Sequence, residues 1–537
     1  METQEYSSKT LDHLGLVAGM CSEIGISAII DTYCGSDSPD QIVSTGKALE
    51  AMILNGLGFV NQRLYLIPHF FQDKPLELLL GPGFKAEHFN DDRLGRALDE
   101  LYERGVTTLF SHLSRQTFKV LDYNPLKGHL DTSTLSVHGR YNSQEEQPVE
   151  LHITQGYSKD HRPDLPQVTL QLICEHLSGI PIHMQALNGN SSDSESFRQV
   201  IQDFGNQLYS EDGLRTIVAD SKLYSEQTLE VLQASGLNWI CRVPGTLEAV
   251  KKLLDEIKPE ELEDLSLEGY RSACYTITYG GVDQHWVVYQ SDSAQERERQ
   301  TLHRQLEKEA QQARKSLTKL QRQPFHCQED AQAAIDQWQQ QWKWHSADQI
   351  QIIQHEKHDG PGRPKAQSTP QNQYTIQAQI HRDQHRLDKE LFKRSLFILG
   401  TNQVIDYQED HEELLQAYKE QHSVERGFRF IKDPSIVASS FFVKKPGRVA
   451  ALLFVMATCL LVYSALEYRI RQALIKENKS VPDQKGKPTQ SPTTRWIFQL
   501  FAGIHILKLP DAKHIVLNLK EEHRNILALL SYWNFYS

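Results

Sequence analysis

The sequence predicts an α/β protein, in which a mixed β-sheet flanked by helices is interrupted by an α+β insertion and preceded by a helical domain. Three observations predict this fold class. Apolar residues recur at helical spacing in residues 1–120, and strand-like runs alternate with helical ones over 121–244. A further strand-like run resumes the pattern only after about residue 395. With 537 residues, the chain is also too long for one hydrophobic core, because domains usually hold about 100–200 residues.

Residues 1–120 are expected to form a helical N-terminal domain. Apolar residues recur at helical spacing over 45–57 and 91–104, and Asn90 and Asp91 are suited to cap the second of these helices. Such a domain could bind DNA or serve only in packing, and helical periodicity does not distinguish the two roles.

Residues 121–244 change to a succession of strands and helices. The expected strands are 129–137, 149–154, 168–175, 180–187, 215–219 and 237–243. Helix-compatible stretches at 194–208 and 225–234 lie between the later strands. The order of strands, helix, strand, helix and strand resembles the opening of an RNase H-like fold, a mixed sheet flanked by helices.

The next region, residues 245–395, is interpreted as a domain inserted into this core. It holds alternating strands at 271–278, 284–289 and 373–380 and a long polar helix at 296–321. The segment GPGRPK at 360–365 fits a turn better than a single minor-groove hook.

The core is then expected to resume over 396–475, with a buried strand at 395–400 and a helix at 408–431. Residues 476–537 form a C-terminal tail, whose stretch 512–530 is amphipathic.

The run 449–466 contains eighteen apolar, uncharged residues, which is at the lower edge of a membrane span. The sequence contains no second run of this kind. We therefore expect the run to form a buried core helix, and we expect no membrane partner. The N-terminus lacks the apolar region of a signal peptide, and the seven cysteines form no C-x-x-C pair. These features predict a cytoplasmic protein without a disulfide framework or a zinc module.

The net charge of −12 counts against a nucleic-acid partner when taken alone. The balance reverses over residues 416–480, which hold eleven Lys and Arg against five Asp and Glu. This cluster is either a solvated helical face or a DNA-binding surface. Lys444, Lys445 and Arg448 are candidates for contacts with the DNA backbone.

Three acidic residues are candidate metal ligands. Asp131 lies within the first strand, Asp220 just after a short β-branched strand, and Glu425 on a helix. Mg²⁺ prefers carboxylate oxygens, and two ions about 3.5–4 Å apart can activate an attacking oxygen and stabilise a leaving one. Such chemistry needs carboxylates that are distant in sequence and adjacent in space. Each residue alone also fits a plainer role, as a cap, a turn residue or an ion-pair partner.

The surroundings of Glu425 favour the functional interpretation. On one continuous helix, Tyr418, Gln421, Glu425 and Lys432 would project within about 60° of one another. A carboxylate on that stripe could hold a metal ion, while the hydroxyl and the ammonium hold a nearby phosphate.

At this point the sequence resembles the DDE transposases of bacterial insertion sequences. The closest branch has a β-rich insertion before the Glu and a Y-x2-R-x3-E-x6-K signature, which stands here as Tyr418-x2-Gln421-x3-Glu425-x6-Lys432. The strings LDTSTLSVHG, GYSKDHRPDLPQ, VADSKLYS, WICRVPG and FILGTN also resemble that branch, in the expected order. The resemblance covers roughly residues 120–475.

The resemblance implies a function. Asp131, Asp220 and Glu425 would be catalytic and bind two Mg²⁺ ions, with Mn²⁺ as an alternative. Tyr418, Gln421 and Lys432 would lie at the DNA near the cut end. The enzyme would cleave DNA at the terminal inverted repeats of its element and transfer the freed strand into target DNA, as a homodimer or larger assembly. No phosphate-binding G-x-x-x-x-G-K-[ST] loop is present, so no ATP is expected.

Two features leave alternatives open. Gln421 stands where Arg is usual and lacks the charge and the bidentate fork of Arg, which allows a catalytically inactive DNA-binding relic. An RNase H-like nuclease that cuts without joining is the other alternative. The polar loop 156–167 is either a solvated hairpin or a segment beside the site, and its Asp160 and Asp164 compete with Asp131 as ligands. Asp131 is preferred because it lies on a strand, where its position is rigid.

Overall fold

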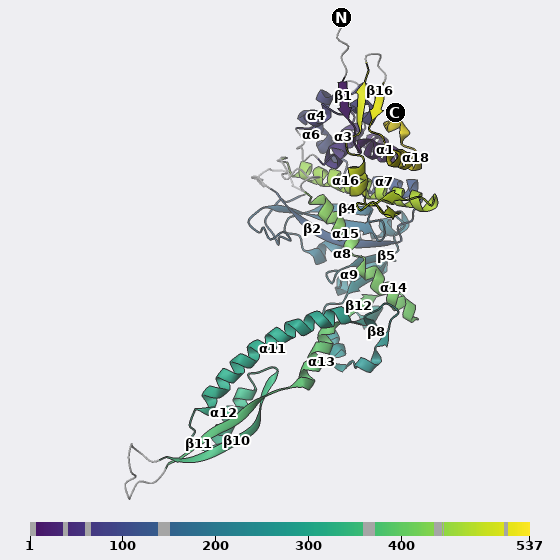
Figure 1. The fold of residues 1–537 in the computed structure, drawn as a ribbon. Helices are drawn as coiled ribbons and strands as arrows, with labels where there is room; N and C mark the ends of the chain where they lie inside the picture. The colour runs from purple at the N-terminus through teal and green to yellow at the C-terminus, as the bar shows by residue number, and fades with distance from the viewer. Residues whose placement is uncertain are drawn as a thin grey trace.

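The computed structural model describes residues 7–35, 41–59, 66–137, 151–357, 371–433, 443, 445–509 and 514–537. Lys444 and the segment 360–365 lie outside these ranges. The described chain forms a body with a helical layer at one end and a large sheet below it, from which a narrow arm projects (Figure 1).

The helical N-terminal domain is confirmed. The side-chain oxygen of Asn90 accepts a hydrogen bond from the backbone N–H of Arg93, so Asn90 caps the helix that begins at Asp91. The helices of this region are α1 (Leu14–Ile24), α2 (Ile26–Cys34), α3 (Thr45–Leu57), α4 (Ile67–Phe71), α5 (Leu76–Leu80), α6 (Asp91–Glu103) and α7 (Val106–Val120).

The C-terminal tail folds back onto this domain. Strand β1 (Ser7–Thr10) pairs with β15 (His505–Lys508), which pairs with β16 (His514–Leu517). The stretch expected to be one amphipathic segment at 512–530 is therefore a strand followed by a helix. The other elements of the tail are β13 (Val481–Pro482), β14 (Pro488–Thr489), α17 (Thr494–Leu500) and α18 (Glu521–Leu530).

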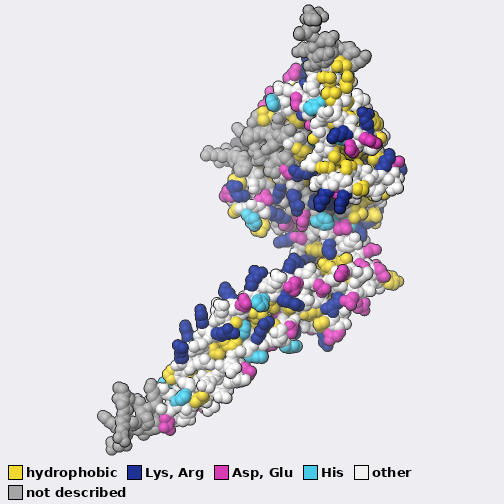
Figure 2. All heavy atoms as spheres, viewed as in Figure 1, with side chains coloured by type: hydrophobic (Ala, Val, Ile, Leu, Met, Phe, Trp, Pro, Cys, Tyr) yellow, Lys and Arg dark blue, Asp and Glu magenta, His cyan; other side chains and the backbone are white. Residues whose placement is uncertain are grey.

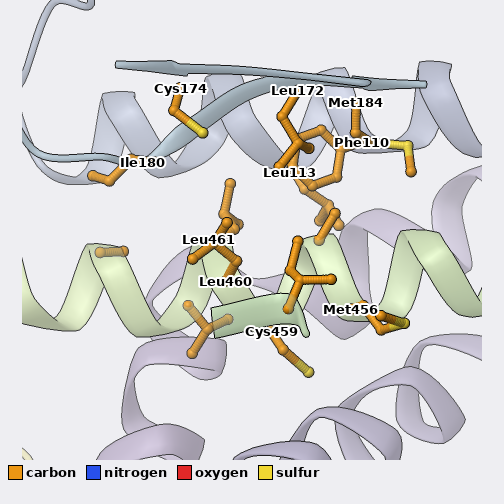
Figure 3. Close-up of a cluster of buried hydrophobic side chains, with 14 of the residues drawn as sticks. Phe110, Leu113, Leu172, Cys174, Ile180, Met184, Met456, Cys459, Leu460 and Leu461 are labelled. Atoms are coloured by element: carbon orange, nitrogen blue, oxygen red, sulfur yellow. The ribbon is translucent and has the colours of Figure 1, made fainter. Parts of the chain in front are cut away.

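The apolar run 449–466 lies within α16 (Pro446–Lys476), a helix of 31 residues. Its hydropathy and length would suit a membrane span, but 89% of its most apolar window is buried inside the protein. Figure 3 shows its side chains Met456, Leu460 and Leu461 below those of β3, β4 and α7. Since α16 packs against both the N-terminal helices and the sheet, it joins the two layers. The expected buried core helix is confirmed. The bent pair α1–α2 is also long and apolar enough for a membrane span, judged by length and composition alone.

The main sheet contains nine strands in the order β4-β3-β2-β5-β6-β12-β9-β8-β7. Strands β2, β3 and β4 are antiparallel, while β5 runs parallel to both β2 and β6. This is the mixed sheet that the sequence predicts. Its strands are β2 (Lys127–Ser136), β3 (Gln167–Glu175), β4 (Pro181–Leu187), β5 (Thr216–Ala219), β6 (Asn238–Arg242), β7 (Glu263–Asp264), β8 (Tyr270–Tyr279), β9 (Val282–Ser291) and β12 (Leu396–Thr401).

Two features of the sheet differ from the expectation. Residues 151–154 form no strand and contribute one isolated bridge, between Thr154 and Gln167. Strands β8 and β9, expected within the insertion, extend the main sheet, because all of β12 pairs with β9 and β9 pairs with β8. Helices α8 (Asp193–Ser210), α9 (Glu226–Ser235) and α10 (Glu248–Glu256) follow β4, β5 and β6.

The arm is what remains of the predicted insertion. Its long helix α11 (Asp292–Gln321) packs with α12 (Gln328–Gln339), α13 (Gln384–Ser395) and the hairpin of β10 (His345–Lys357) and β11 (Gln371–Arg382). Two small apolar clusters hold it together, one around Trp338 and Ile376 and one around Trp344 and Leu387. The arm therefore has a core of its own, separate from the main sheet (Figure 1).

Candidate active site

The sheet brings Asp131 and Asp220 to neighbouring positions. Strand β2 runs parallel to β5, and the last registered pair of the two strands is Leu130 with Ala219. Asp131 and Asp220 are the next residues of their chains. Because parallel strands advance together, the two carboxylates lie side by side at the same level of the sheet. They are far apart in the sequence, and the parallel pairing of β2 with β5 brings them together.

A third carboxylate belongs to the same cluster and was not predicted. Asp193 is the first residue of α8, and its Oδ1 accepts a hydrogen bond of 2.6 Å from the hydroxyl of Thr132, the neighbour of Asp131. An Asp at a helix N-terminus just beyond a strand is the one local signal that could have marked it. That signal usually denotes a cap.

A lysine lies between these carboxylates. The Lys159 ammonium is 3.6 Å from Asp131 Oδ1 and 3.5 Å from Asp193 Oδ2, and it donates a hydrogen bond of 2.7 Å to the carbonyl oxygen of Thr132. Lys159 belongs to the loop 156–167, so this loop lies beside the site and is not a hairpin in free solvent. Asp164 of the loop instead pairs with Arg162.

The electrostatics of the cluster suit a bound cation. Burial raises the pKa of Asp131 to about 6, with Asp220 and Asp193 adding to the rise and Lys159 opposing it. Burial also raises the pKa of Asp220, again with a contribution from Asp193. Two of the three carboxylates contact the Lys159 ammonium, and all three lie in a partly desolvated place, which favours a further positive charge.

The helix expected over 408–431 is two helices. Helix α14 (Gln408–Lys419) ends before Glu420, and α15 (His422–Ile431) begins after Gln421. Tyr418 therefore lies on a different helix from Glu425, and the projection of four side chains onto one straight helix is incorrect. Tyr418 is still near the cluster, since burial raises the pKa of its phenol and the Asp220 carboxylate contributes to that rise.

Two polar contacts link the junction between α14 and α15 to the sheet. His176 Nε2 lies 3.0 Å from Glu420 Oε2, and the other ring nitrogen of His176 lies 2.9 Å from Nε2 of His129. His129 precedes Asp131 by two residues on β2, so the two side chains share one face of the sheet. The junction is thus connected, through His176 and His129, to the strand that carries Asp131. Burial lowers the pKa of His129 to about 3.

Helix α15 packs closely on β2, β3 and α16. A Cβ at Gly427 would lie 3.0 Å from a methyl of Leu460 and 3.7 Å from the sulfur of Cys174, so glycine permits this approach. Glu425 is exposed on α15. Within the part of the chain that the structure describes, no three His, Cys, Asp or Glu side chains are grouped to hold a metal ion. Glu425 as the third ligand stays a prediction.

The other predicted DNA contacts have different surroundings. Lys432 Nζ is 2.7 Å from Asp160 Oδ1, which links α15 to the loop 156–167. Arg448 donates two hydrogen bonds, of 2.7 and 2.6 Å, to the carboxylate of Asp99 on α6, so it fastens α16 to the N-terminal domain. Lys445 is 3.7 Å from the same carboxylate but remains largely exposed.

Comparisons with known proteins identify two matching families and one similar solved structure. The transposase DDE domain matches residues 128–462, more than half of the chain, and a domain of unknown function (DUF4277) matches residues 6–115. Among solved structures, the chain is similar to a piggyBac transposase synaptic complex with hairpin DNA, at a TM-score of 0.38 and 10% identity, over 98% of this chain and 87% of that one. No curated protein matches. The family match includes both aspartates, the loop of Lys159 and helix α15, and on that match the chain belongs to the family of DDE transposases.

Proposed function

We propose that this transposase cleaves DNA at the ends of its insertion sequence and transfers the freed strand to target DNA at the cluster of Asp131, Asp193 and Asp220. The observation that carries the proposal is the pairing of β2 with β5, which places two family-matched aspartates side by side. Burial raises the pKa of both groups, and the neighbouring Asp193 carboxylate adds to the rise in each case.

Divalent metal ions are generally used by this family, and carboxylate oxygens, which this cluster offers, are the ligands that such ions prefer. The cluster has three partly buried carboxylates, two of which contact the Lys159 ammonium, and it offers hard oxygen donors. Asp131 and Asp220 would hold the ions, with Glu425 as the third ligand, and two Mg²⁺ ions or Mn²⁺ are the proposed species. When bound, the metal would activate the attacking oxygen and neutralise charge on the phosphate.

The protein's own cations have roles in binding DNA. Lys159 neutralises part of the carboxylate charge and would turn toward the phosphate once other positive charge is present. Lys432 would exchange Asp160 for a phosphate oxygen, with which it can form a charge-assisted bond of the same kind. Tyr418 and Gln421, at the two sides of the helix junction, would contact the DNA near the cut end.

The proposed partners are the terminal inverted repeats and the target DNA, bridged by a homodimer or larger assembly without ATP. The seven cysteines are all free, which suits a reducing cytoplasm as the place of action. Gln421 favours a second candidate function, a transposase that binds DNA without cleaving it, because Gln lacks the permanent charge of Arg.

The test is cleavage of labelled DNA that carries the flanking repeats, in Mg²⁺ or Mn²⁺. The wild type is expected to cut at the repeat end, and Asp131→Asn, Asp220→Asn and Glu425→Gln are each expected to bind the DNA and leave it uncut. Glu413→Gln, an exposed change on α14, serves as the matched control for Glu425→Gln. Binding without cleavage by the wild type in either metal would favour the inactive relic, and Gln421→Arg should then restore cutting. Full activity of Glu425→Gln would remove Glu425 from the site.

A further inference from the structure

The long helix of the arm carries a one-sided row of cations. Arg297, Arg304, Lys308, Lys315 and Lys319 of α11 are all exposed. At about 100° per residue they project within about 60° of one another, and no Asp or Glu of α11 falls in that sector. Figure 2 shows Lys and Arg side chains along the edge of the arm where α11 lies. These five residues are called the arm stripe below.

The arm core fixes the direction in which the stripe faces. The buried residues of α11 are Leu302, Leu306, Ala313 and Leu317, which project on the opposite side of the helix. Leu302 and Leu306 pack with Trp344 and Leu387, and the other two pack in the cluster around Trp338. Helix α11 is therefore held at both ends of its length, and the stripe is turned to solvent.

The stripe differs from an ordinary solvated helix face in two ways. A solvated face usually mixes charges of both signs, which pair along the helix. Here none of the five cations makes an ion pair within the described chain, and Arg297 only donates a hydrogen bond to the carbonyl oxygen of Ser293. The stripe also stands out in a chain whose net charge is −12. Such a separation of charge favours a partner with a dense row of negative charge.

The length of the stripe fits a DNA duplex. From Arg297 to Lys319 the helix rises by about 33 Å, at about 1.5 Å per residue. One turn of duplex DNA spans about 34 Å and carries a phosphate charge about every 1.7 Å along its axis. A helix of this length, with five cations on one side that form no ion pair within the described chain, can contact phosphates along a comparable length of duplex.

We infer that the arm stripe binds the sugar–phosphate backbone of duplex DNA, independently of base sequence, outside the carboxylate cluster. The inference rests on the proposed DNA-cleaving function and adds a second DNA contact to it. The arm would lengthen the bound footprint by about one helical turn beyond the catalytic site. It would thereby supply affinity and orientation without reading bases.

The test compares two full-length variants with five neutralised cations each. The arm variant carries Arg297→Gln, Arg304→Gln, Lys308→Gln, Lys315→Gln and Lys319→Gln. The control variant carries Lys119→Gln, Lys252→Gln, Lys485→Gln, Lys487→Gln and Arg524→Gln, all at exposed positions of other elements. The two variants have equal net charge, so any difference between them reports position. Circular dichroism and the unfolding temperature confirm that both are folded.

Binding to a duplex of unrelated sequence, about two turns long, is measured by fluorescence anisotropy from about 50 to 200 mM salt. The arm variant is expected to bind at least about tenfold more weakly than the control variant at the lowest salt. Its slope of log K against log salt should be shallower by about 0.9 for each lost phosphate contact, up to about 4.5. Equal affinity and slope for the two variants would overturn the inference, as would competition by polyglutamate as effective as competition by DNA at equal charge.

The outcomes separate this inference from the proposed function. If the wild type cleaves DNA and both variants bind DNA equally, the arm stripe is ruled out as a DNA contact, while the proposed role of the carboxylate cluster still stands. A wild type that neither binds nor cleaves DNA would overturn both. Asp131→Asn should retain the full salt dependence of the wild type, because it changes the cluster and not the arm.

Discussion

The Lys432 ammonium lies 2.7 Å from the Asp160 carboxylate, and so joins helix α15 to the loop whose preceding residue, Lys159, contacts Asp131. Two consecutive loop residues thus connect the carboxylate cluster with the helix of the family signature. This loop is the part of the site that can respond when DNA or a metal ion arrives, because both of its charged contacts are with groups that those ligands would engage.

Asp160→Asn should raise the affinity for repeat-end DNA, because it releases Lys432 from its internal partner. Lys432→Gln should lower that affinity, and Asp160→Asn added to Lys432→Gln should have no further effect. Both side chains are partly exposed, so the pair stabilises the fold by only about 0.2–1 kcal/mol and the unfolding temperature should hardly change. A double-mutant cycle of DNA affinities measures the coupling, and additive effects would show that Asp160 does not restrain Lys432.

Lys159→Met should move the acidic limb of the pH–cleavage profile to higher pH. The Lys159 ammonium lowers the pKa of Asp131, which burial otherwise raises to about 6. Removing the ammonium leaves the pKa higher still, so the carboxylate becomes protonated at a higher pH and loses its capacity to hold a cation. The profile is measured at saturating DNA, with Lys222→Met as a comparison beside Asp220. An unchanged acidic limb would show that Lys159 does not influence the ionisation of Asp131.

Asp193 should act through its charge. Asp193→Asn keeps an oxygen that can accept the hydrogen bond from Thr132, whereas Asp193→Ala loses both that bond and the charge. Cleavage by both variants should fall by about 10- to 100-fold, the size of effect common for groups that orient metal ligands. Raising the metal concentration should recover part of the activity of Asp193→Asn. If Asp193→Asn matched the wild type and only Asp193→Ala were slow, Asp193 would serve as a hydrogen-bond acceptor alone.

Arg448→Met should lower the stability of the protein by roughly 1–3 kcal/mol, because it breaks two charge-assisted hydrogen bonds to Asp99 between the N-terminal domain and α16. Gly95→Ala should act in the same direction, since a Cβ there would lie 2.8 Å from a guanidinium nitrogen of Arg448. Urea unfolding measures the loss, with Lys445→Met as the control. If folded Arg448→Met lost much of its affinity for DNA, the result would support the prediction from the sequence that Arg448 contacts DNA.

Acid should destabilise the protein through His183. This side chain is fully buried on β4 beside Phe204, and burial lowers the pKa of its imidazole to about 4. The unfolded chain takes up a proton near pH 6.5 while the folded chain does not, so stability present above pH 6.5 is lost as the pH falls toward 4. At pH 5 the loss from this residue is about 2 kcal/mol. Between pH 7 and pH 5, the free energy of unfolding of His183→Leu should fall by correspondingly less than that of the wild type, as measured by urea unfolding. An equal fall in the two proteins would assign the effect to other groups.

Much of the fold follows from local patterns. The strand-like runs of β2, β3 and β5, the cap at Asn90 and the apolar run within α16 each predict an element that the structure contains. Asp131 and Asp220 could be singled out because each stands at a strand position that resembles the family motif. The break at Glu420 and Gln421 was missed, because both residues suit a helix interior and only the contact of Glu420 with His176 identifies the junction.

The sequence by itself determined the family, the positions of most strands along the chain, and the two aspartates as candidates. Only the tertiary structure decided that Asp193 and Lys159 join those aspartates, that β8 and β9 belong to the main sheet, and that Arg448 binds Asp99. The physical reason is the range of the interactions. Helical and strand periodicity arises from neighbours a few residues apart, whereas an ion pair or a strand pairing depends on which distant segments pack together. The arm stripe combines the two, since its spacing can be found in the sequence but its exposure is set by the core on the other side of α11.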